Sequence, residues 1–325
     1  MNLPAETRAL GHWAGNAKWL APVAGLVIVG AFFQIKSPAF LESTNLRFIA
    51  AQTVLVGVCG VGMTFIMIGG GIDLSVGSVM ALAGVSLAVC LKNDLPPPAG
   101  IAVAVLLGGL CGLVNALIIT GLRVIPFVAT LGMFGIARGM ARFLADNRIV
   151  RLEENPDQLA WMMQPLGSAT WLAPAVWVML AVGILAGVVL NLTVFGRQTI
   201  AIGSNETAAR LSGIHIVRQK LLLYTLGGLL TGLAGAFLFA NTCEGDPTAA
   251  AGLELQVIAA VVIGGGSLMG GEGSVLGTLL GALMLTGLVN GCTMAGYQNY
   301  VQEIIIGAII VVAVALDYFR RRSPG

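Results

Sequence analysis

The sequence predicts an all-α, polytopic membrane protein with about ten transmembrane helices and both termini in the cytoplasm. Three observations indicate this fold class. Ten stretches are apolar enough, and nearly long enough, to cross a bilayer, and almost nothing between them could build a separate soluble domain. The chain of 325 residues is 57% hydrophobic and only 10% charged, whereas a soluble domain carries about 25% charged residues. The basic residues are also divided unevenly between alternate connections, which predicts the orientation.

The apolar runs define the expected helices. A span needs about 20 mostly apolar residues, because only a helix satisfies its backbone polar groups within hydrocarbon. The third, eighth and tenth runs fall short and are interpreted as broken helices or as helices that include flanking Gly and Ser. Residues 19–316 are therefore predicted to form one transmembrane domain, with tails at 1–18 and 317–325. The runs are 19–34, 47–68, 76–91, 100–120, 126–145, 171–192, 221–241, 253–266, 275–293 and 300–316.

The charges of the connections predict which side each faces. With a cytoplasmic N-terminus, the inside segments hold ten basic residues and the outside loops hold five. Most acids fall in the outside loops, four of them in the long loop 146–170. Cytoplasmic loops are rich in Lys and Arg, so both termini and the loop 193–220 are expected inside. The inside basic residues are Arg8, Lys18, Arg123, Arg197, Arg210, Arg218, Lys220, Arg320, Arg321 and Arg322.

Charged side chains are nearly absent from the middle of the runs. Arg138 and Arg142 lie one turn apart near the outer end of the fifth run, where they are expected to snorkel to the interface or to pair with Asp146. Glu254 and Glu303 are expected near outer helix ends. An ion-coupled carrier usually shows buried carboxylates or a proton relay, so this pattern disfavours that class.

The polar groups inside the runs are instead neutral. Such groups suit brief hydrogen bonds to an uncharged, hydroxyl-bearing cargo, although for any single residue a hydrogen bond between helices is the commoner role. No nucleophile–base pair or metal-ligand spacing accompanies them, so an intramembrane enzyme has little support. The net charge of +2 likewise gives no reason to expect nucleic acid. These groups are Gln52, Thr53, Thr64, Asn115, Thr130, Asn241, Gln256, Thr278, Thr286, Asn290 and Gln302.

The inside loop 193–220 contains a predicted short helix. Ser204 or Asn205 suits its N-cap, Glu206 follows in the first turn, and Arg210 lies one turn further on, where it can pair with Glu206. Gly213 supplies the C-terminal stop. About two turns of helix are not stable alone in water, so the segment either packs on its own helix ends or docks into a partner. Its expected docking surface is Ala208, Ala209 and Leu211.

Two glycine-rich junctions resemble each other. The first joins the second and third runs at 68–79, and the other joins the eighth and ninth at 263–275. Both begin Ile-Gly-Gly-Gly and end Gly-Ser-Val, and each carries one acid, Asp73 or Glu272. Paired interruptions in two halves indicate a transport site, whereas the simpler interpretation is a tight turn in which Asp73 or Ser75 caps the next helix. Neither junction has the Lys-Ser/Thr of a phosphate-binding loop, so this chain is not expected to bind ATP.

Three ordered motifs resemble those of a known family. They are Gly-Gly-Ile-Asp-Leu-Ser-Val-Gly at 70–77, Gly-Ser-Asn-Glu-Thr-Ala-Ala-Arg-Leu-Ser-Gly-Ile at 203–214, and Ile-Gly-Gly-Gly-Ser-Leu-Met-Gly-Gly-Glu-Gly-Ser at 263–274. Together they are similar to the permeases of bacterial ribose-type sugar ABC importers, a branch that handles ribose, xylose, arabinose and galactose. The resemblance extends from about residue 45 to 316.

The resemblance implies a transport subunit of the bacterial inner membrane, itself not an enzyme, that forms the pathway for a neutral monosaccharide. It implies a second permease copy, a cytoplasmic ABC ATPase that binds ATP and Mg²⁺, an extracytoplasmic sugar-binding protein, and no cofactor in this chain. It also implies that 203–214 meets the ATPase, through Asn205, Glu206, Ala208, Ala209, Arg210, Leu211 and Gly213. The candidates for the pathway and its broken helices are Gly70, Gly71, Asp73, Ser75, Gly264, Gly265, Gly266 and Asn290.

The sequence departs from the family at two positions. Gly266 stands where these permeases often have Thr, and Gly291 is followed by Cys292 where a second Asn is common. Both departures are expected near the pathway or its outer mouth, so they affect the identity of the substrate. Two alternatives stay open: a permease for a nucleoside or a branched-chain amino acid, and a stand-alone secondary carrier or channel.

Overall fold

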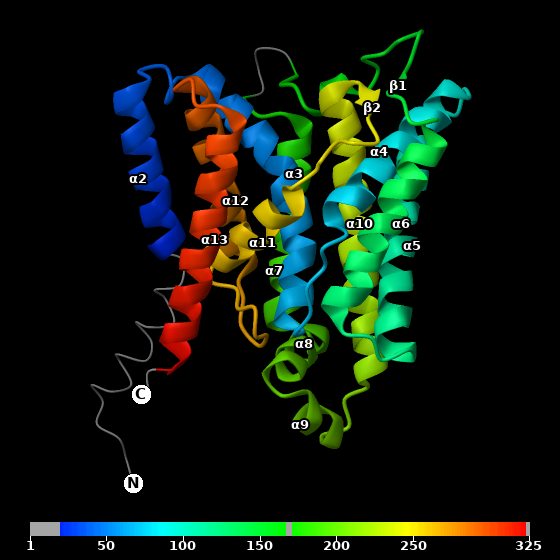
Figure 1. The fold of residues 1–325 in the computed structure, drawn as a ribbon, viewed down its shortest axis with the longest axis vertical. Coiled ribbons are helices and arrows are strands. Elements are labelled where there is room, and N and C mark those ends of the chain that lie inside the picture. Colours follow the sequence, from blue (N-terminus) through cyan, green and yellow to red (C-terminus); the bar gives the residue numbers. More distant parts are fainter. Residues whose placement is uncertain (1–19, 167–170, 323–325) are drawn as a thin grey trace.

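The chain forms an upright bundle of helices (Figure 1). The computed structural model describes the backbone of residues 20–166 and 171–322, and the side chains of 22–166 and 171–315. Each of the ten predicted runs is helical. The helices are α2 (Leu20–Lys36), α3 (Ser43–Ile68), α4 (Val76–Lys92), α5 (Pro97–Gly121), α6 (Pro126–Leu144), α7 (Pro174–Leu192), α10 (Ile216–Thr242), α11 (Leu253–Ile263), α12 (Val275–Met294) and α13 (Asn299–Arg322).

Six of these helices are long and apolar enough to cross a membrane: α3, α5, α6, α7, α10 and α12. Four shorter apolar helices, α2, α4, α11 and α13, occupy the other predicted runs. The polytopic membrane fold is therefore confirmed, while the number of complete spans stays a prediction. The predicted tail 1–18 lies outside the described residues, and α13 continues past residue 316 to Arg322.

Local sequence signals set several helix starts. A proline opens α5, α6 and α7, where its fixed φ suits the first turn and its missing N–H costs no hydrogen bond. The hydroxyl of Ser274 accepts a hydrogen bond from the backbone N–H of Gly277 and so caps α12. These signals separate helices whose apolar composition alone would not show where each begins.

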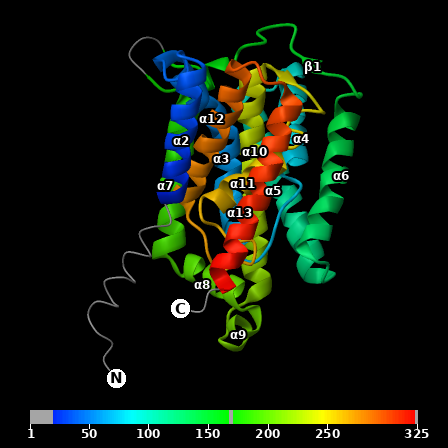
Figure 2. The ribbon, with the colours of Figure 1, turned by 60° about the vertical axis from the view of Figure 1, so that its left-hand side comes forward.

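Helix α3 forms the centre of the bundle and is buried along nearly its whole length. Helices α5 and α10 cross with glycines at the interface, so that their backbones touch directly. A Cβ added to Gly108 would lie 2.4 Å from the carbonyl oxygen of Gly228, and one on Gly112 would lie 2.1 Å from that of Tyr224. Helix α6 lies at the edge of the bundle (Figure 2) and buries a face of small residues against α4 and α5. Small residues of this kind permit close helix packing in membranes.

The two ends of the bundle differ. Two further helices, α8 (Val194–Ser204) and α9 (Glu206–Leu211), protrude at one end, toward which the last turns of α13 extend (Figure 1). At the opposite end, the strands β1 (Val150–Arg151) and β2 (Glu244–Gly245) pair antiparallel, near the 3₁₀ turn η2 (Ala160–Met162). The β pair joins the long loop 146–170 to the end of α10 and is braced by an ion pair between Arg151 and Glu244 at 2.9 Å.

Candidate functional site

Two stretches of non-helical backbone enter the interior of the bundle, and a short helix begins after each; we call these two stretches the interruptions. The chain leaves α3 at Ile68, runs through the non-helical segment 69–75, and only then forms α4. In the same way it leaves β2, runs through 246–252, and then forms α11. Figure 1 shows both α4 and α11 beginning near mid-height. The prediction of broken helices is therefore confirmed for these two elements, and non-helical backbone at this depth must find partners inside the protein.

The first interruption is stabilised by a small polar network. Asp73 is only 4% exposed, and its Oδ1 accepts hydrogen bonds from the backbone N–H of Ser75 at 2.8 Å and from the Ser75 hydroxyl. Asn115 of α5 donates to the Ser75 hydroxyl at 3.2 Å, and Thr130 of α6 donates to the carbonyl of Ile72 at 3.3 Å. Asp73 therefore stabilises the turn before α4, whereas Ser75, the N-cap residue, makes no side-chain cap hydrogen bond, so the capping interpretation is wrong in its detail. The Asp73 side chain does not line the hollows described below.

The second interruption is held by an arginine from a neighbouring helix. Nη1 of Arg138, on α6, donates to the carbonyl oxygens of Pro247 and Ala249, both at 2.8 Å. The expectation that Arg138 snorkels or pairs with Asp146 is therefore wrong. The broken helix leaves carbonyl groups without partners inside the bundle, and the guanidinium satisfies two of them.

Glu254 also lies elsewhere than predicted. It occupies the first turn of α11, near mid-height rather than at an outer helix end, and its Oε1 accepts a hydrogen bond from the backbone N–H of Gly252 at 3.2 Å. A Cβ on Gly77 would lie 2.4 Å from Glu254 Oε2 and 2.4 Å from the carbonyl oxygen of Ala250. The first turn of α4 is thus packed directly against the start of α11, and Gly77 makes that contact possible.

Neutral polar side chains line a hollow between α3, α11 and α12. Its volume is about 370 Å³, within the range of small-ligand pockets. An adjoining hollow of about 380 Å³ lies toward the β1–β2 end and shares Phe48 and Gln52 with the first. We call the two together the outer groove. Its polar lining is Gln52, Gln256, Thr286, Asn290 and Thr293 in the inner part, with Thr44, Arg47, Gln164 and Asn241 in the outer part.

The amide groups of the outer groove are already positioned by hydrogen bonds. Gln52 donates to Asn241 at 3.2 Å, and Asn45 donates to Asn290 at 3.0 Å. The Arg47 guanidinium lies 5.8 Å from the ring of Trp171. Amides held in this way present donors and acceptors together, which suits the hydroxyl groups of a neutral solute.

The sequence identified part of this groove. Gln52, Asn241, Gln256, Thr286 and Asn290 belong to the predicted set and come together here. Other members of that set are buried in structural contacts, as the alternative interpretation proposed: the hydroxyls of Thr64 and Thr278 lie 2.7 Å apart, and Thr53, Asn115 and Thr130 are buried. Sequence reasoning missed Gln164, because its position in the long outer loop carried no signal of proximity to the helices.

The glycine-rich junctions lie at the opposite end, beside α8. Gly271 donates its backbone N–H to the carbonyl of Ile68 at 2.8 Å, which joins the second junction to the first. A Cβ on Gly203 of α8 would lie 1.7 Å from that same carbonyl oxygen, and one on Gly270 would lie 2.8 Å from the carbonyl oxygen of Gly203. We call this contact of Ile68, Gly70, Gly203, Gly270 and Gly271 the glycine junction.

These junctions require small residues for two different reasons. At Gly264 the backbone of α12 lies too close for a side chain, because a Cβ there would lie 2.4 Å from the carbonyl carbon of Gly277. At Gly70 and Gly265 the backbone φ angles are +79° and +88°, a region that L side chains rarely adopt. Gly266 also lies in this junction of α11 and α12, and Asn290 lines the outer groove; that Gly266 lies near the pathway stays a prediction.

The short helix α9 forms as predicted. Asn205 accepts a hydrogen bond from the backbone N–H of Ala208 at 2.9 Å and caps the helix. Glu206 pairs with Arg210 at 3.1 Å, and Gly213, with φ of +83°, ends the helix. Sequence reasoning missed a second partner, Lys220 of α10, whose Nζ lies 2.7 Å from Glu206 Oε2.

The exposed face of α9 differs from the predicted one. Ala209 is buried in a cluster with Ile202 of α8 and Ile216 of α10, so its inclusion in the docking surface is corrected. Leu211 is 85% exposed at the tip of the segment, and Ala208 is exposed beside it. The segment therefore both packs on its own helix ends and presents an uncovered apolar tip.

The pKa of Glu206 is lowered from its ordinary value, first by the hydrogen bond from Lys220 and further by the charges of Lys220 and Arg210. Its carboxylate therefore stays ionised at neutral pH and ties α9 to α10. Because α8 carries Gly203 and α9 carries Leu211, one segment connects the exposed apolar tip to the glycine junction.

Comparisons with known proteins agree with this architecture. The family described as branched-chain amino acid transport system / permease component matches residues 45–314. The ribose import permease protein RbsC of Bacillus subtilis (strain 168) is 39% identical over 316 residues, which cover 96% of each chain. The ribose import permease protein RbsC of Escherichia coli (strain K12) is 39% identical over 90% of this chain and 91% of its own. The L-arabinose transport system permease protein AraH of Escherichia coli (strain K12) is 36% identical over 98% and 95%. These matches confirm the resemblance to sugar-importer permeases.

Proposed function

Because the chain belongs to the family of branched-chain amino acid transport system permease components, we propose that it is the membrane-spanning permease subunit of an ATP-driven importer for a neutral monosaccharide. The relatives that it resembles include a ribose import permease and an L-arabinose transport permease. The observation that carries the sugar assignment is the outer groove, whose inner part is lined by amides and hydroxyls and by no charged side chain. A zwitterionic amino acid would require charged partners at that position.

The proposal assigns the chemistry of energy conversion to a partner. A cytoplasmic ABC ATPase would bind ATP and Mg²⁺ and hydrolyse the ATP, and an extracytoplasmic protein would deliver the sugar to the β1–β2 end. This chain would supply the pathway, without a cofactor of its own, in the bacterial inner membrane. The inside location of α9 is supported by the basic residues that cluster at its end of the bundle.

We further propose that two copies assemble around the pathway. Paired ATPase sites close together, and closed twofold symmetry is the usual arrangement of identical subunits. Helix α13 packs against α11, which lines the groove. It carries exposed apolar side chains that a second copy would cover, including Ile304, Val311 and Val312. Native mass spectrometry that found a single permease copy in the active complex would count against this arrangement.

The glycine junction suggests how ATP binding would act on the pathway. Closure of the ATPase would move the α8–α9 segment, and Gly203 would pass this displacement to the chain ends next to α3, α11 and α12 without an intervening side chain. The helices that line the groove would then shift together. Packed backbones transmit such displacements because they have few ways to absorb them.

The test is uptake into proteoliposomes that contain the permease, its ATPase and its binding protein. We expect uptake to require ATP and to survive collapse of the proton gradient, whereas a secondary carrier would show the reverse. Gln256→Leu and Asn290→Leu should lower sugar uptake, while Thr53→Val should not, because among the described residues the Thr53 hydroxyl bonds to Ile49 of its own helix and to no other group. Equal uptake by all three variants would refute the groove as the pathway.

A further inference from the structure

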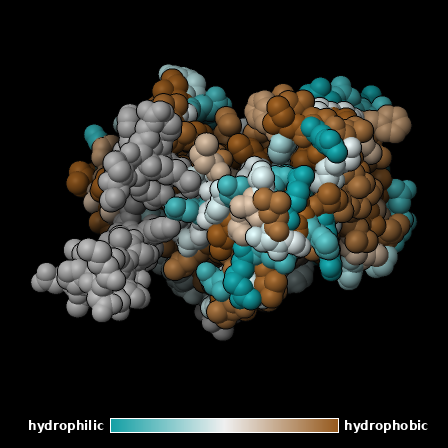
Figure 3. Space-filling model, turned by 90° about the horizontal axis from the view of Figure 1, so that it is seen from below, coloured by the Kyte–Doolittle hydropathy of each residue, from teal (hydrophilic) through white to brown (hydrophobic). Residues whose placement is uncertain are grey.

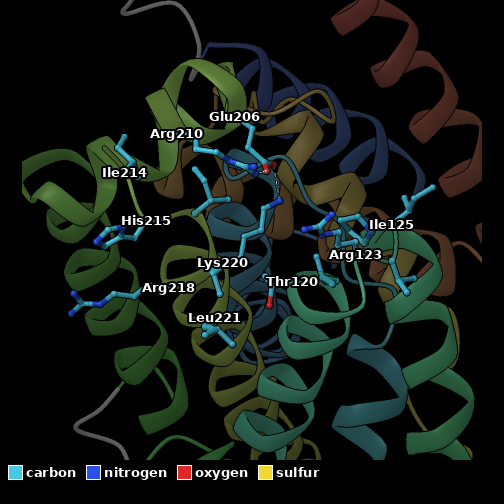
Figure 4. Close-up of a pocket in the computed structure, with 15 residues that line it drawn as sticks. Thr120, Arg123, Ile125, Glu206, Arg210, Ile214, His215, Arg218, Lys220 and Leu221 are labelled. Carbon is cyan, nitrogen blue, oxygen red and sulfur yellow. Dashed lines mark hydrogen bonds and ion pairs between the residues drawn. The ribbon is translucent and has the colours of Figure 1, made fainter. Parts of the chain in front are cut away.

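The largest of the described hollows lies outside the proposed pathway. It has a volume of about 930 Å³ and lies between the turn that joins α5 to α6 and the start of α10, beneath α9. Figure 4 shows Arg123 entering it from the α5–α6 turn and Lys220 from α10, with Glu206 and Arg210 above them and His215 and Arg218 at the far rim. We call this hollow the basic pocket.

The basic pocket has an excess of positive charge. Its lining includes Arg123, Arg210, Arg218 and Lys220 against one carboxylate, that of Glu206. Glu206 is already bound by Lys220 at 2.7 Å and by Arg210 at 3.1 Å. Arg123 and Arg218 are exposed and make no hydrogen bond or ion pair with any residue that the structure describes. Figure 4 shows Arg123 extending toward Lys220 and Arg218 pointing outward at the far rim, so an anion in the pocket would meet the unengaged Arg123 guanidinium, and Arg218 would add positive charge at the edge.

The membrane side of the pocket is apolar. Leu122, Ile125 and Val217 are 74%, 68% and 54% exposed at the ends of α5, α6 and α10, and Ile119, Val124 and Leu221 form part of the lining. Figure 3, which views this end, shows hydrophilic side chains gathered beside hydrophobic ones. A ligand with a phosphate group and acyl chains would match both parts.

The depth of the pocket favours a lipid over the ATPase. Helix α9 protrudes beyond the ends of α5, α6 and α10 (Figure 1), so a protein seated on the tip at Leu211 would rest further from the membrane than the pocket does. The pocket lies level with the ends of the spanning helices, where lipid headgroups lie, and basic pockets between such helices on the cytoplasmic side bind anionic headgroups.

From these observations we propose that the basic pocket binds the headgroup of an anionic phospholipid of the cytoplasmic leaflet. The proposal rests on the inside placement of α9 given above, but not on the transported substrate. A lipid bound there would contact α5, α10 and the Glu206 network at once, so it would stabilise the position of α9 before any partner docks.

The test places the purified permease in nanodiscs of phosphatidylcholine mixed with phosphatidylglycerol. The permease is then released from the nanodiscs in a native mass spectrometer, and the amounts of the two lipids that stay bound to it are compared. Arg123→Gln combined with Arg218→Gln should lower retained phosphatidylglycerol roughly tenfold or more, from the contribution of each basic side chain at an anionic surface. The double Lys variant keeps both charges but not the guanidinium geometry, so it should retain more phosphatidylglycerol than the double Gln variant. Arg197→Gln, which removes an exposed charge of α8 outside the pocket, should have little effect.

Several results would overturn the proposal. One is unchanged phosphatidylglycerol retention in the double Gln variant, and another is an equal loss in Arg197→Gln, which would indicate a diffuse charge effect. Competition by inorganic phosphate as strong as by the lipid would assign the site to a free anion. Loss of ATPase co-purification with normal lipid retention would assign the pocket to the partner protein. Because lipid retention is measured on the permease alone, its failure is distinct from a failure of transport.

Discussion

Gly203→Ala is the sharpest test of the proposed route from the ATPase to the pathway. The new Cβ would lie 1.7 Å from the carbonyl oxygen of Ile68 and 2.5 Å from the backbone nitrogen of Gly271, whereas ordinary contact begins at 3.4 Å. Both neighbours are backbone atoms, so no side chain can rotate away. The α8 segment must therefore move away from the junction by more than an ångström, and it must weaken the Gly271–Ile68 hydrogen bond of 2.8 Å.

The cost follows from these contacts. Overpacking of a well-packed interior costs about 1–3 kcal/mol, and loss of a hydrogen bond costs about 1 kcal/mol more, so the variant should be destabilised by about 2–4 kcal/mol. The effect on coupling should be larger than the effect on folding, because the surrounding helices keep their own packing. We expect the complex to assemble but to lose most of its binding-protein-stimulated ATP hydrolysis and sugar uptake.

The assay compares uptake and ATP hydrolysis per folded complex, with folding judged by size-exclusion chromatography and thermal unfolding. Gly187→Ala on α7 is the matched control, because a Cβ there meets nothing within 4 Å and Ala favours the helix by about 1 kcal/mol. Gly203→Ala that transported as well as Gly187→Ala would refute the reasoning, since the steric conflict would then have been absorbed without moving the junction.

Three further predictions concern the docking tip, the broken helix and pH. Leu211→Glu should abolish ATPase co-purification and leave permease folding intact, because this side chain is 85% exposed; normal co-purification would exclude the tip from the interface. Arg138→Gln should lower uptake while ATPase binding persists, because two carbonyls lose a charged donor worth about 1.5–3 kcal/mol each; wild-type uptake by purified complexes would contradict this. Since the pKa of Glu206 is lowered in the folded chain, its ion pairs stabilise α9 at pH values above the ordinary 4.5 and are lost as pH falls through the lower folded value. ATPase co-purification should accordingly hold steady from neutral pH toward 4.5 in the wild type, and Glu206→Gln should co-purify less ATPase throughout this range. A sharp loss of co-purified ATPase from the wild type near neutral pH would be inconsistent with the lowered pKa.

The sequence was most informative where local chemistry decides the structure. The apolar runs predicted the helices, and Asn205, Glu206 and Gly213 predicted α9, because capping and short-range pairing act within one or two turns. The partners that complete those features come from distant positions. Lys220 next to Glu206 and Arg138 next to Pro247 depend on how helices pack, which periodicity does not specify. Ala209 was assigned to the wrong face because a six-residue helix has too little pattern to show which side is covered.

The candidate site was predictable to a similar extent. Neutral amides predicted an uncharged cargo, but only the fold separates Gln256, which faces a hollow, from Asn115, which is buried against Ser75. The paired glycine motifs predicted related junctions in two halves, yet nothing in their spacing indicated that the two junctions touch each other through Gly271 and Ile68. Contacts between segments roughly two hundred residues apart are a property of tertiary packing.

The glycine crossing of α5 and α10 has a practical consequence for measuring motion in this protein. Backbones that touch at Gly108 and Gly112 have no side-chain layer between them, so these two helices cannot slide past each other without separating. They should therefore keep a constant distance throughout a transport cycle. Spin labels placed on the exposed faces of α5 and α10 would provide an internal ruler, against which displacement of a third label on α8 or α11 could be read in the same sample.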